Sequence, residues 1–233
     1  HTLVTNDGSK GIRAWNVATH TPIADFQTDR SDGSDHFASA AMSLDGSVVA
    51  TGSYDGKVRF WDVNTGKQIG DPLTGPAEPV LSVAFSPDRR ILATGGSHGN
   101  VQLWNIATHT PIGDPLPGFT GEKVMSATFS PDGSTLAAAA ELGMGYLWDV
   151  ASHAQVGAPL IPHYAESIGS VAFSPDSHTL ATSTDTDGAA VRLWDVPPTT
   201  RVDSILCTKV GRSLTPDEWQ RYVPDLPYRQ ICP

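Results

Sequence analysis

The tetrapeptide Phe60-Trp61-Asp62-Val63 is one of five equivalent segments in a chain of 233 residues. The other four are Ala14-Trp15-Asn16-Val17, Leu103-Trp104-Asn105-Ile106, Leu147-Trp148-Asp149-Val150 and Leu193-Trp194-Asp195-Val196. Successive tryptophans are 46, 43, 44 and 46 residues apart. A second marker keeps the same spacing, since an aspartate stands two residues after a serine at Asp45, Asp88, Asp132 and Asp176. Two markers in phase indicate a true structural repeat.

Each full repeat is predicted to hold four short strands separated by turns. In the second repeat the strands are expected at 37–43, 47–52, 57–63 and 67–73, with glycine-containing turns between them. A period in this range with a strand pattern predicts an all-β propeller built from four-stranded antiparallel blades. About five blades are expected, at approximately 1–26, 37–73, 80–116, 124–160 and 168–206.

The two ends of the chain depart from the regular repeat. The first repeat lacks an innermost strand, and the chain starts within a repeat at His1, so we expect further blades upstream in a longer protein. A five-bladed ring closed by another strand is the alternative. Residues 207–233 are expected to form a tail with a short helix, because Thr215, Pro216 and Glu218 fit an N-cap, a first helical position and a capping box.

Charge and composition narrow the range of partners. The net charge of −10 repels phosphate backbones and argues against direct nucleic-acid binding. No apolar run approaches the roughly 20 residues of a membrane-spanning helix, so we expect no membrane partner.

The two cysteines, Cys207 and Cys232, either form a disulfide within the tail or stay reduced. We favour the reduced form and a cytoplasmic location, because cysteine-poor chains are typical of reducing compartments.

Residue patterns that signal catalysis are missing from the sequence. The eight histidines lie mostly in turns, and neither a Gly-x-Ser-x-Gly elbow, a phosphate loop nor a His-Glu-x-x-His motif occurs. We therefore expect no catalytic residue, metal or cofactor. A propeller hydrolase or lactonase that uses channel-facing carboxylates stays open as an alternative. A sugar-binding propeller is less favoured, because Tyr54 is not repeated at the equivalent Ser97 and Glu141.

The repeated tryptophans and aspartates make the chain resemble the tryptophan-aspartate (WD) repeat family from Thr2 to Val196. That resemblance implies a rigid scaffold that binds proteins or peptides on its faces, usually without catalysis. It also implies a hydrogen-bonded brace within each blade, which joins a histidine, a turn aspartate, a serine or threonine of the second strand, and the tryptophan.

The residues that this brace requires are unevenly distributed. Only the fifth repeat has a candidate for every position, and these are His163, Asp185 or Asp187, one of Ser183, Thr184 and Thr186, and Trp194. The second repeat keeps Ser53, Asp55 and Trp61 without the histidine, while His98 and Leu142 replace the aspartate in the third and fourth. We therefore expect apolar packing to hold most blades together.

The tail carries a second resemblance. Its residues resemble the C-terminal ends of propellers in large actinobacterial signalling proteins, and the matching positions are Cys207, Gly211-Arg212-Ser213-Leu214-Thr215, Glu218-Trp219, Tyr222, Pro227-Tyr228-Arg229 and Cys232-Pro233. The resemblance implies that this chain is the sensor or docking part of a larger bacterial regulator.

An acidic residue recurs four positions before the equivalent serines Ser39, Ser82, Ser126 and Ser170. The four acids are Asp35, Glu78, Glu122 and Glu166. They precede the innermost strands, so we expect their carboxylates to surround the channel mouth on one face. One interpretation is that they solvate the loop and cap a local turn. The other is a negative patch that binds a basic peptide, with Tyr54 as a further partner-binding residue.

Overall fold

The computed structural model describes residues 2–6, 11–26, 36–75, 78–161, 167–184 and 191–196, together with Thr215. The chain divides into two units, His1–Val196 and Pro197–Pro233, and the described strands all belong to the first. The tail helix and the pair Cys207 and Cys232 were predicted in a part of the chain that lies outside the described residues.

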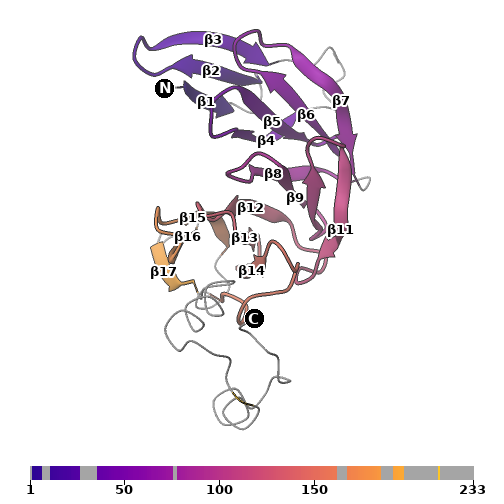
Figure 1. Ribbon diagram of the computed structural model, residues 1–233, viewed down its shortest axis with the longest axis vertical. Coiled ribbons are helices and arrows are strands. Elements are labelled where there is room, and N and C mark those ends of the chain that lie inside the picture. The colour runs from indigo at the N-terminus through magenta and orange to yellow at the C-terminus, as the bar shows by residue number, and fades with distance from the viewer. Residues whose placement is uncertain are drawn as a thin grey trace. The chain divides into compact units, whose positions relative to one another are not determined.

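Five antiparallel sheets make up the first unit, and in each of them the strands pair in chain order (Figure 1). The first two sheets contain β1 (Thr2–Asn6), β2 (Ile12–Asn16) and β3 (Thr21–Phe26), then β4 (Phe37–Met42), β5 (Val48–Ser53), β6 (Lys57–Asp62) and β7 (Gln68–Thr74). The third contains β8 (Val80–Phe85), β9 (Ile91–Gly96), β10 (Val101–Asn105) and β11 (Thr110–Leu116). The fourth and fifth contain β12 (Val124–Phe129), β13 (Thr135–Ala140) and β14 (Gly145–Asp149), then β15 (Ile168–Phe173), β16 (Thr179–Thr184) and β17 (Val191–Asp195).

These sheets confirm the five predicted blades, with the innermost strand of the first one missing among the described residues. The innermost strands β4, β8, β12 and β15 are neighbours in that order. Each tryptophan of the repeat lies on the third strand of its blade, at β2, β6, β10, β14 and β17. Trp61, Trp104 and Trp148 are buried as the repeat predicts. Trp15 and Trp194, in the first and last blades, are only partly buried.

The predicted outer strand of the fourth blade needs a correction. Instead of a continuous strand up to Leu160, the segment makes two isolated bridges, from Trp148 to Gln155 and from Gly145 to Leu160. Gly157 lies between the bridges with a φ of 71°, but Gly70 and Gly113 have a φ of 64° within the continuous strands β7 and β11, so this conformation does not by itself explain the interruption. The predicted outer strand of the fifth blade falls outside the described residues.

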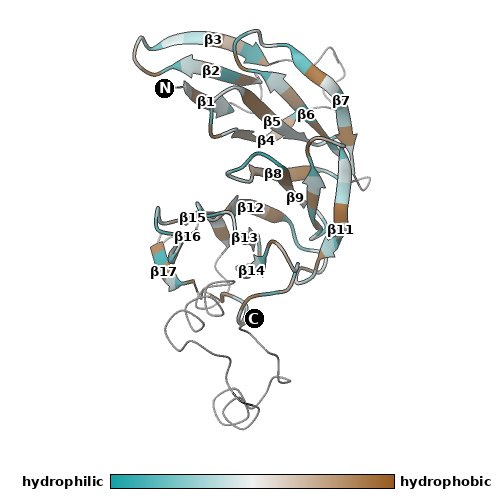
Figure 2. Ribbon diagram, viewed as in Figure 1, coloured by the Kyte–Doolittle hydropathy of each residue, from teal (hydrophilic) through white to brown (hydrophobic). Residues whose placement is uncertain are grey.

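The hydrophobic core is divided among the interfaces between neighbouring blades, which we call seams. Each cluster of buried apolar side chains draws from two consecutive blades. This follows from strand geometry, because alternate side chains point to opposite faces of a sheet and each inner blade has a neighbour on both faces. Figure 2 shows hydrophobic residues concentrated on the inner strands and long hydrophilic stretches on the outer strands β3 and β7. The seams therefore fix one blade against the next.

Candidate interaction site

One face of the blades combines two kinds of connection. We call it the entry face, and it consists of the loops before the innermost strands (residues 36, 78–79 and 122–123) and the turns between the second and third strands (residues 54–56, 97–100 and 141–144). Backbone hydrogen bonds tie each turn to its loop, from Tyr54 N to His36 O at 3.0 Å, from Ser97 N to Pro79 O at 3.0 Å and from Glu141 N to Lys123 O at 2.9 Å. The entry face therefore has the same backbone frame in three consecutive blades.

Glu78 is buried at the entry face rather than exposed at a channel mouth, with only 6% of its surface accessible. Its Oε2 accepts hydrogen bonds from His98 N at 2.7 Å and faces His98 Nδ1 at 2.9 Å, while Oε1 accepts one from Asn100 Nδ2 at 2.6 Å. The carboxylate thus caps the turn after β9, as the first of the two interpretations proposes. The prediction that Glu78 belongs to an exposed negative patch is therefore wrong, because the residue is buried.

Gly96 explains why this carboxylate can be buried. A Cβ at Gly96 would lie 2.4 Å from Glu78 Oε1, so any side chain there would displace the acid. The equivalent residue is Ser53 in the second blade and Ala140 in the fourth, as the pairing with the first residue of each innermost strand shows. The buried acid of the third blade therefore depends on a glycine that the neighbouring blades lack.

Glu122 occupies the same register in the fourth blade but has a different environment. Its Oε2 is buried and has no hydrogen-bond donor within the described part of the chain. Leu142 and Met144 stand where the third blade has His98 and Asn100, and neither side chain has a polar donor. Nearby, Lys123 Nζ and Glu141 Oε2 form an exposed ion pair at 3.0 Å. The other two predicted acids, Asp35 and Glu166, lie outside the described residues.

In the second blade, Asp55 forms a buried ion pair with Arg59 at 2.7 Å, and Arg59 also donates to Ser53 Oγ at 3.1 Å. Burial opposes ionisation of Asp55. The hydrogen bonds from Arg59 and from Lys57 N outweigh it, so the pKa of Asp55 lies below its ordinary value. This pair fixes the turn that carries Tyr54.

The tryptophan brace uses a different residue from the one predicted. Trp61 Nε1 donates to Thr51 Oγ1 at 2.9 Å rather than to Ser53, and Trp104 donates to Thr94 in the same way. In the fifth blade Trp194 donates to Thr182 Oγ1 at 3.0 Å, and not to the predicted Ser183, Thr184 or Thr186. The other predicted members of that brace, His163 and Asp187, lie outside the described residues.

In the first three blades, the sequence signal for the hydrogen bond of the indole N–H is a threonine ten residues before the tryptophan. The fourth blade lacks this threonine. Ala138 stands at that position, and Trp148 Nε1 donates instead to the carbonyl oxygen of Pro117 at 2.9 Å. The indole N–H is therefore satisfied by a new partner where the threonine is missing.

Large apolar side chains are exposed on the entry face. Tyr54 is 56% exposed and Leu142 is 69% exposed, and both lie on turns between the second and third strands of their blades. Leu44, on the opposite face, is also exposed but lies in a turn whose polar groups are used internally, since Asp45 accepts hydrogen bonds from Ser43 and Ser47. The entry face therefore offers apolar contacts beside the acids.

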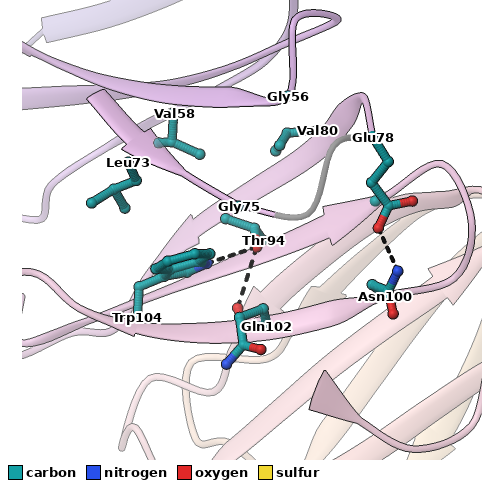
Figure 3. A pocket seen from close by; sticks show the side chains of 11 residues that line it. Gly56, Val58, Leu73, Gly75, Glu78, Val80, Thr94, Asn100, Gln102 and Trp104 are labelled. Carbon is teal, nitrogen blue, oxygen red and sulfur yellow. Dashed lines mark hydrogen bonds between the residues drawn. The ribbon is translucent and has the colours of Figure 1, made fainter. Parts of the chain in front are cut away.

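A pocket opens at the seam between the second and third blades (Figure 3). Its lining consists of Gly56, Val58, Leu73, Gly75, Glu78, Val80, Thr94, Gly96, Asn100, Gln102 and Trp104. Figure 3 shows Glu78 and Asn100 at one end of the pocket and Trp104 and Leu73 at the other. It is mainly apolar, with one buried carboxylate.

The described residues contain no group of three or more His, Cys, Asp or Glu side chains placed to hold a metal ion. Within the same residues, no helix has the length and apolar character needed to cross a membrane.

A succession of antiparallel sheets with buried seams and a tryptophan on every third strand defines a β-propeller-type repeat protein. The repeat described as WD domain, G-beta repeat (WD40) matches residues 31–62, 66–105, 113–149 and 157–195. The chain therefore belongs to the WD40 family, whose members generally bind protein partners. A search of curated proteins found no match to the chain. The second, third and fourth matched repeats each begin at the outer segment of one blade and end at the third strand of the next, so they span a seam.

Proposed function

We propose that this chain is a non-catalytic interaction scaffold and that its entry face binds a protein or peptide partner. The observation that carries the proposal is the exposure of Tyr54 and Leu142 on turns whose backbone is fixed by hydrogen bonds to the neighbouring loops. Tyrosine is enriched among the residues that dominate binding at protein interfaces, and an exposed leucine adds apolar contact area.

The rigidity of the entry face supports this function energetically. A partner that binds a preorganised surface loses less free energy to the ordering of loops and side chains than one that binds a flexible surface. The buried Asp55–Arg59 pair holds the Tyr54 turn, and Glu78 holds the equivalent turn of the third blade. The surface is therefore in place before the partner arrives.

We propose further that the partner segment is basic. The net charge of −10 attracts positive segments over a distance of about one Debye length, roughly 8 Å at physiological ionic strength. Glu122 supports the same choice, because its side chain is only half-buried and its Oε2 has no donor within the described residues, so a lysine or arginine of the partner would supply one once the carboxylate turns outward.

Selection from a displayed library of random peptides tests the interaction function. We expect enriched peptides to lose binding to the double variant Tyr54→Ser/Leu142→Ser and to keep it for Leu44→Ser, which removes an even more exposed leucine from the opposite face. Lower salt should strengthen binding to the native chain. Equal loss in both variants, or no enrichment above a blank support, would overturn the proposal.

The non-catalytic part of the proposal is tested separately. A panel of ester, lactone and phosphoester substrates, with divalent metal added and then chelated, should show no turnover above background. Metal-dependent turnover that disappears with substitution of acidic residues would favour the propeller hydrolase or lactonase instead.

We also propose that the propeller is the docking part of a larger bacterial regulator located in the cytoplasm. The tail motif around Gly211-Arg212-Ser213 supports this, through its resemblance to propellers of actinobacterial signalling proteins. The coding sequence upstream of His1 tests it: a nucleotide-dependent switch or a DNA-binding domain is the expected finding, and a secretion signal directly before His1 would overturn it.

A further inference from the structure

The fourth blade exposes three large apolar side chains at its end of the entry face. Met125 is 42% exposed, Leu142 is 69% exposed and Ile161 is 63% exposed. We call these three residues the apolar stripe. The residues at the same positions are Ala38, Asp55 and Thr74 in the second blade and Leu81, His98 and Pro117 in the third. The stripe is therefore a feature of the fourth blade and not of the repeat.

The stripe crosses the blade from its innermost strand to its outer segment. Met125 is the bulged residue at the start of β12, where the register of the pairing with β13 shifts. Leu142 lies on the turn between β13 and β14. Ile161 directly follows Leu160, which bridges Gly145 at the start of β14. The three side chains thus stand at the same end of one sheet, over its first, middle and last strands.

A carboxylate lies at the inner end of the stripe. Glu122 precedes Met125 by three residues, is half-buried, and has no hydrogen-bond donor for its Oε2 within the described residues. The neighbouring Lys123 is already paired with Glu141. These three charged residues leave an excess of one negative charge beside the apolar side chains.

The length of the stripe indicates the conformation of a matching peptide. Neighbouring strands are about 4.8 Å apart, so the first and fourth strands of a blade are separated by about 14 Å. Alternate side chains of an extended chain point to one side, and three of them span about 13–14 Å over five residues. A helix would need nine residues to place three side chains over about 12 Å, and so short a helix is marginal in water. The stripe therefore fits an extended segment better.

We propose that the apolar stripe binds an extended segment of a protein partner, with aliphatic side chains at alternate positions and an arginine at the inner end. The arginine pairs with Glu122 once the half-buried carboxylate turns outward. Arginine suits this place better than lysine, because its guanidinium is less strongly hydrated and its stem can lie along apolar surface. The inference rests on the proposed interaction function and names the kind of partner that the fourth blade selects.

Designed peptides test the pattern directly. Two labelled nonapeptides carry three valines at alternate positions with serines between them, and the arginine precedes the valines in one and follows them in the other. Fluorescence anisotropy measures their affinity for the chain. We expect the better of the two to bind about 10-fold more tightly than a peptide of the same composition with three adjacent valines, because adjacent side chains of an extended chain point to opposite sides.

Substitutions on the fourth blade locate the binding site. Leu142→Ser and Ile161→Ser should each weaken binding of the better peptide about 5-fold, because each removes an apolar side chain that the peptide covers. Both residues are exposed, so the fold should be retained. Tyr54→Ser is the matched control on the entry face of the second blade and should leave the affinity unchanged.

A double-mutant cycle tests the pairing with Glu122. Replacement of the peptide's arginine by glutamine should weaken binding to the native chain about 10-fold at low salt, the effect of losing a hydrogen bond between charged groups. The same replacement should weaken binding to Glu122→Gln by less than about 2-fold, because the partner of the arginine is already missing.

Four results would overturn the inference: equal affinity for alternating and adjacent valines, tighter binding of a helical peptide with apolar residues at every fourth position, equal losses in Tyr54→Ser and Ile161→Ser, or an arginine preference that persists in Glu122→Gln. A dimer in sedimentation velocity that Leu142→Ser dissociates would assign the stripe to a second copy instead. Library peptides that require Tyr54 and Leu142 but lack the alternating pattern would defeat this inference alone. A library without enriched peptides defeats the interaction function, whereas the designed peptides decide the inference.

Discussion

The hydroxyl of Ser39 in β4 accepts a hydrogen bond from the backbone N–H of Val83 in β8, at 3.2 Å across the seam between the second and third blades. Ser126 and the N–H of Val171 repeat this relationship at 3.3 Å across the seam between the fourth and fifth. Innermost strands of neighbouring blades do not pair with each other. These serines therefore connect blades at points where no backbone ladder does.

Replacement of Ser39 by Ala is expected to lower the free energy of unfolding by about 1–3 kcal/mol, because the buried N–H of Val83 loses its acceptor. Urea denaturation measures the change. Ser170→Ala is the matched control, since Ser170 is an exposed serine at the same register of the fifth blade, and it should change stability by less than about 0.5 kcal/mol. Equal losses in the two variants would contradict a role for the seam hydrogen bond.

The threonine partner of the tryptophan gives a second prediction. Thr51→Val keeps the shape of the side chain but removes the acceptor of Trp61 Nε1, which is buried. We expect a loss of about 1–3 kcal/mol in thermal or urea denaturation, the cost of an unsatisfied buried donor. Thr74→Val, at an exposed position of β7, should be nearly neutral. A neutral Thr51→Val would mean that the indole N–H finds another acceptor, as Trp148 does with Pro117.

The arrangement of the blades follows from the sequence because it depends on short-range patterns. The tryptophan spacing locates the third strands, and the turn residues around Asp45 and Asp88 locate the ends of the first ones. Burial of a tryptophan additionally requires a neighbouring blade on both faces. Trp61 and Trp104 have two such neighbours, whereas Trp15, in the first blade, is covered less.

The environment of the predicted acids could not be derived in the same way. A glutamate in a loop is usually solvated, and Glu78 is buried only because Gly96, 18 residues later, leaves space for it. Its partners His98 and Asn100 lie on a turn that pairing brings beside the loop. Glu122 has the same local pattern and a different environment, because Ala140 and Leu142 replace the corresponding residues. Such contacts depend on the identity of residues across the blade rather than on the repeat.

Acid should destabilise the blades through their turn aspartates. Hydrogen bonds from Ser43 and Ser47 hold the pKa of Asp45 at about 2, and the pKa values of Asp88 and Asp176 are lowered chiefly by Ser86 and Ser174. A carboxyl whose pKa is lower in the folded state than in the unfolded chain stabilises the fold above its unfolded pKa, about 4. That stabilisation is lost as the pH falls from about 4 towards 2.

We therefore expect the melting temperature to fall steeply between about pH 4 and about pH 2, and to fall less steeply in Asp45→Asn. Asp71→Asn is the matched control, because Asp71 is exposed on the outer strand β7 and its carboxylate has no hydrogen-bond partner among the described residues. Calorimetric scans across this range measure both. If the melting temperature of Asp45→Asn falls as steeply with pH as that of the native chain, the acid destabilisation comes from groups other than Asp45.

Removal of the negative charge should have opposite effects at Glu78 and Glu122, although the two acids share one register. Glu78→Gln weakens hydrogen bonds from His98 and Asn100 to a buried carboxylate and should cost about 1–3 kcal/mol. Glu122→Gln removes a charge whose buried Oε2 has no donor in the described residues, so stability should be unchanged or rise by up to about 1 kcal/mol. Urea denaturation of both variants measures these changes.

Because Glu122 is proposed to contact a basic partner, the same Glu122→Gln substitution should weaken capture of the selected peptides and reduce the salt dependence of that capture. A loss of stability in Glu122→Gln as large as that in Glu78→Gln would show that Glu122 is satisfied within the folded chain and has no donor to gain from a partner.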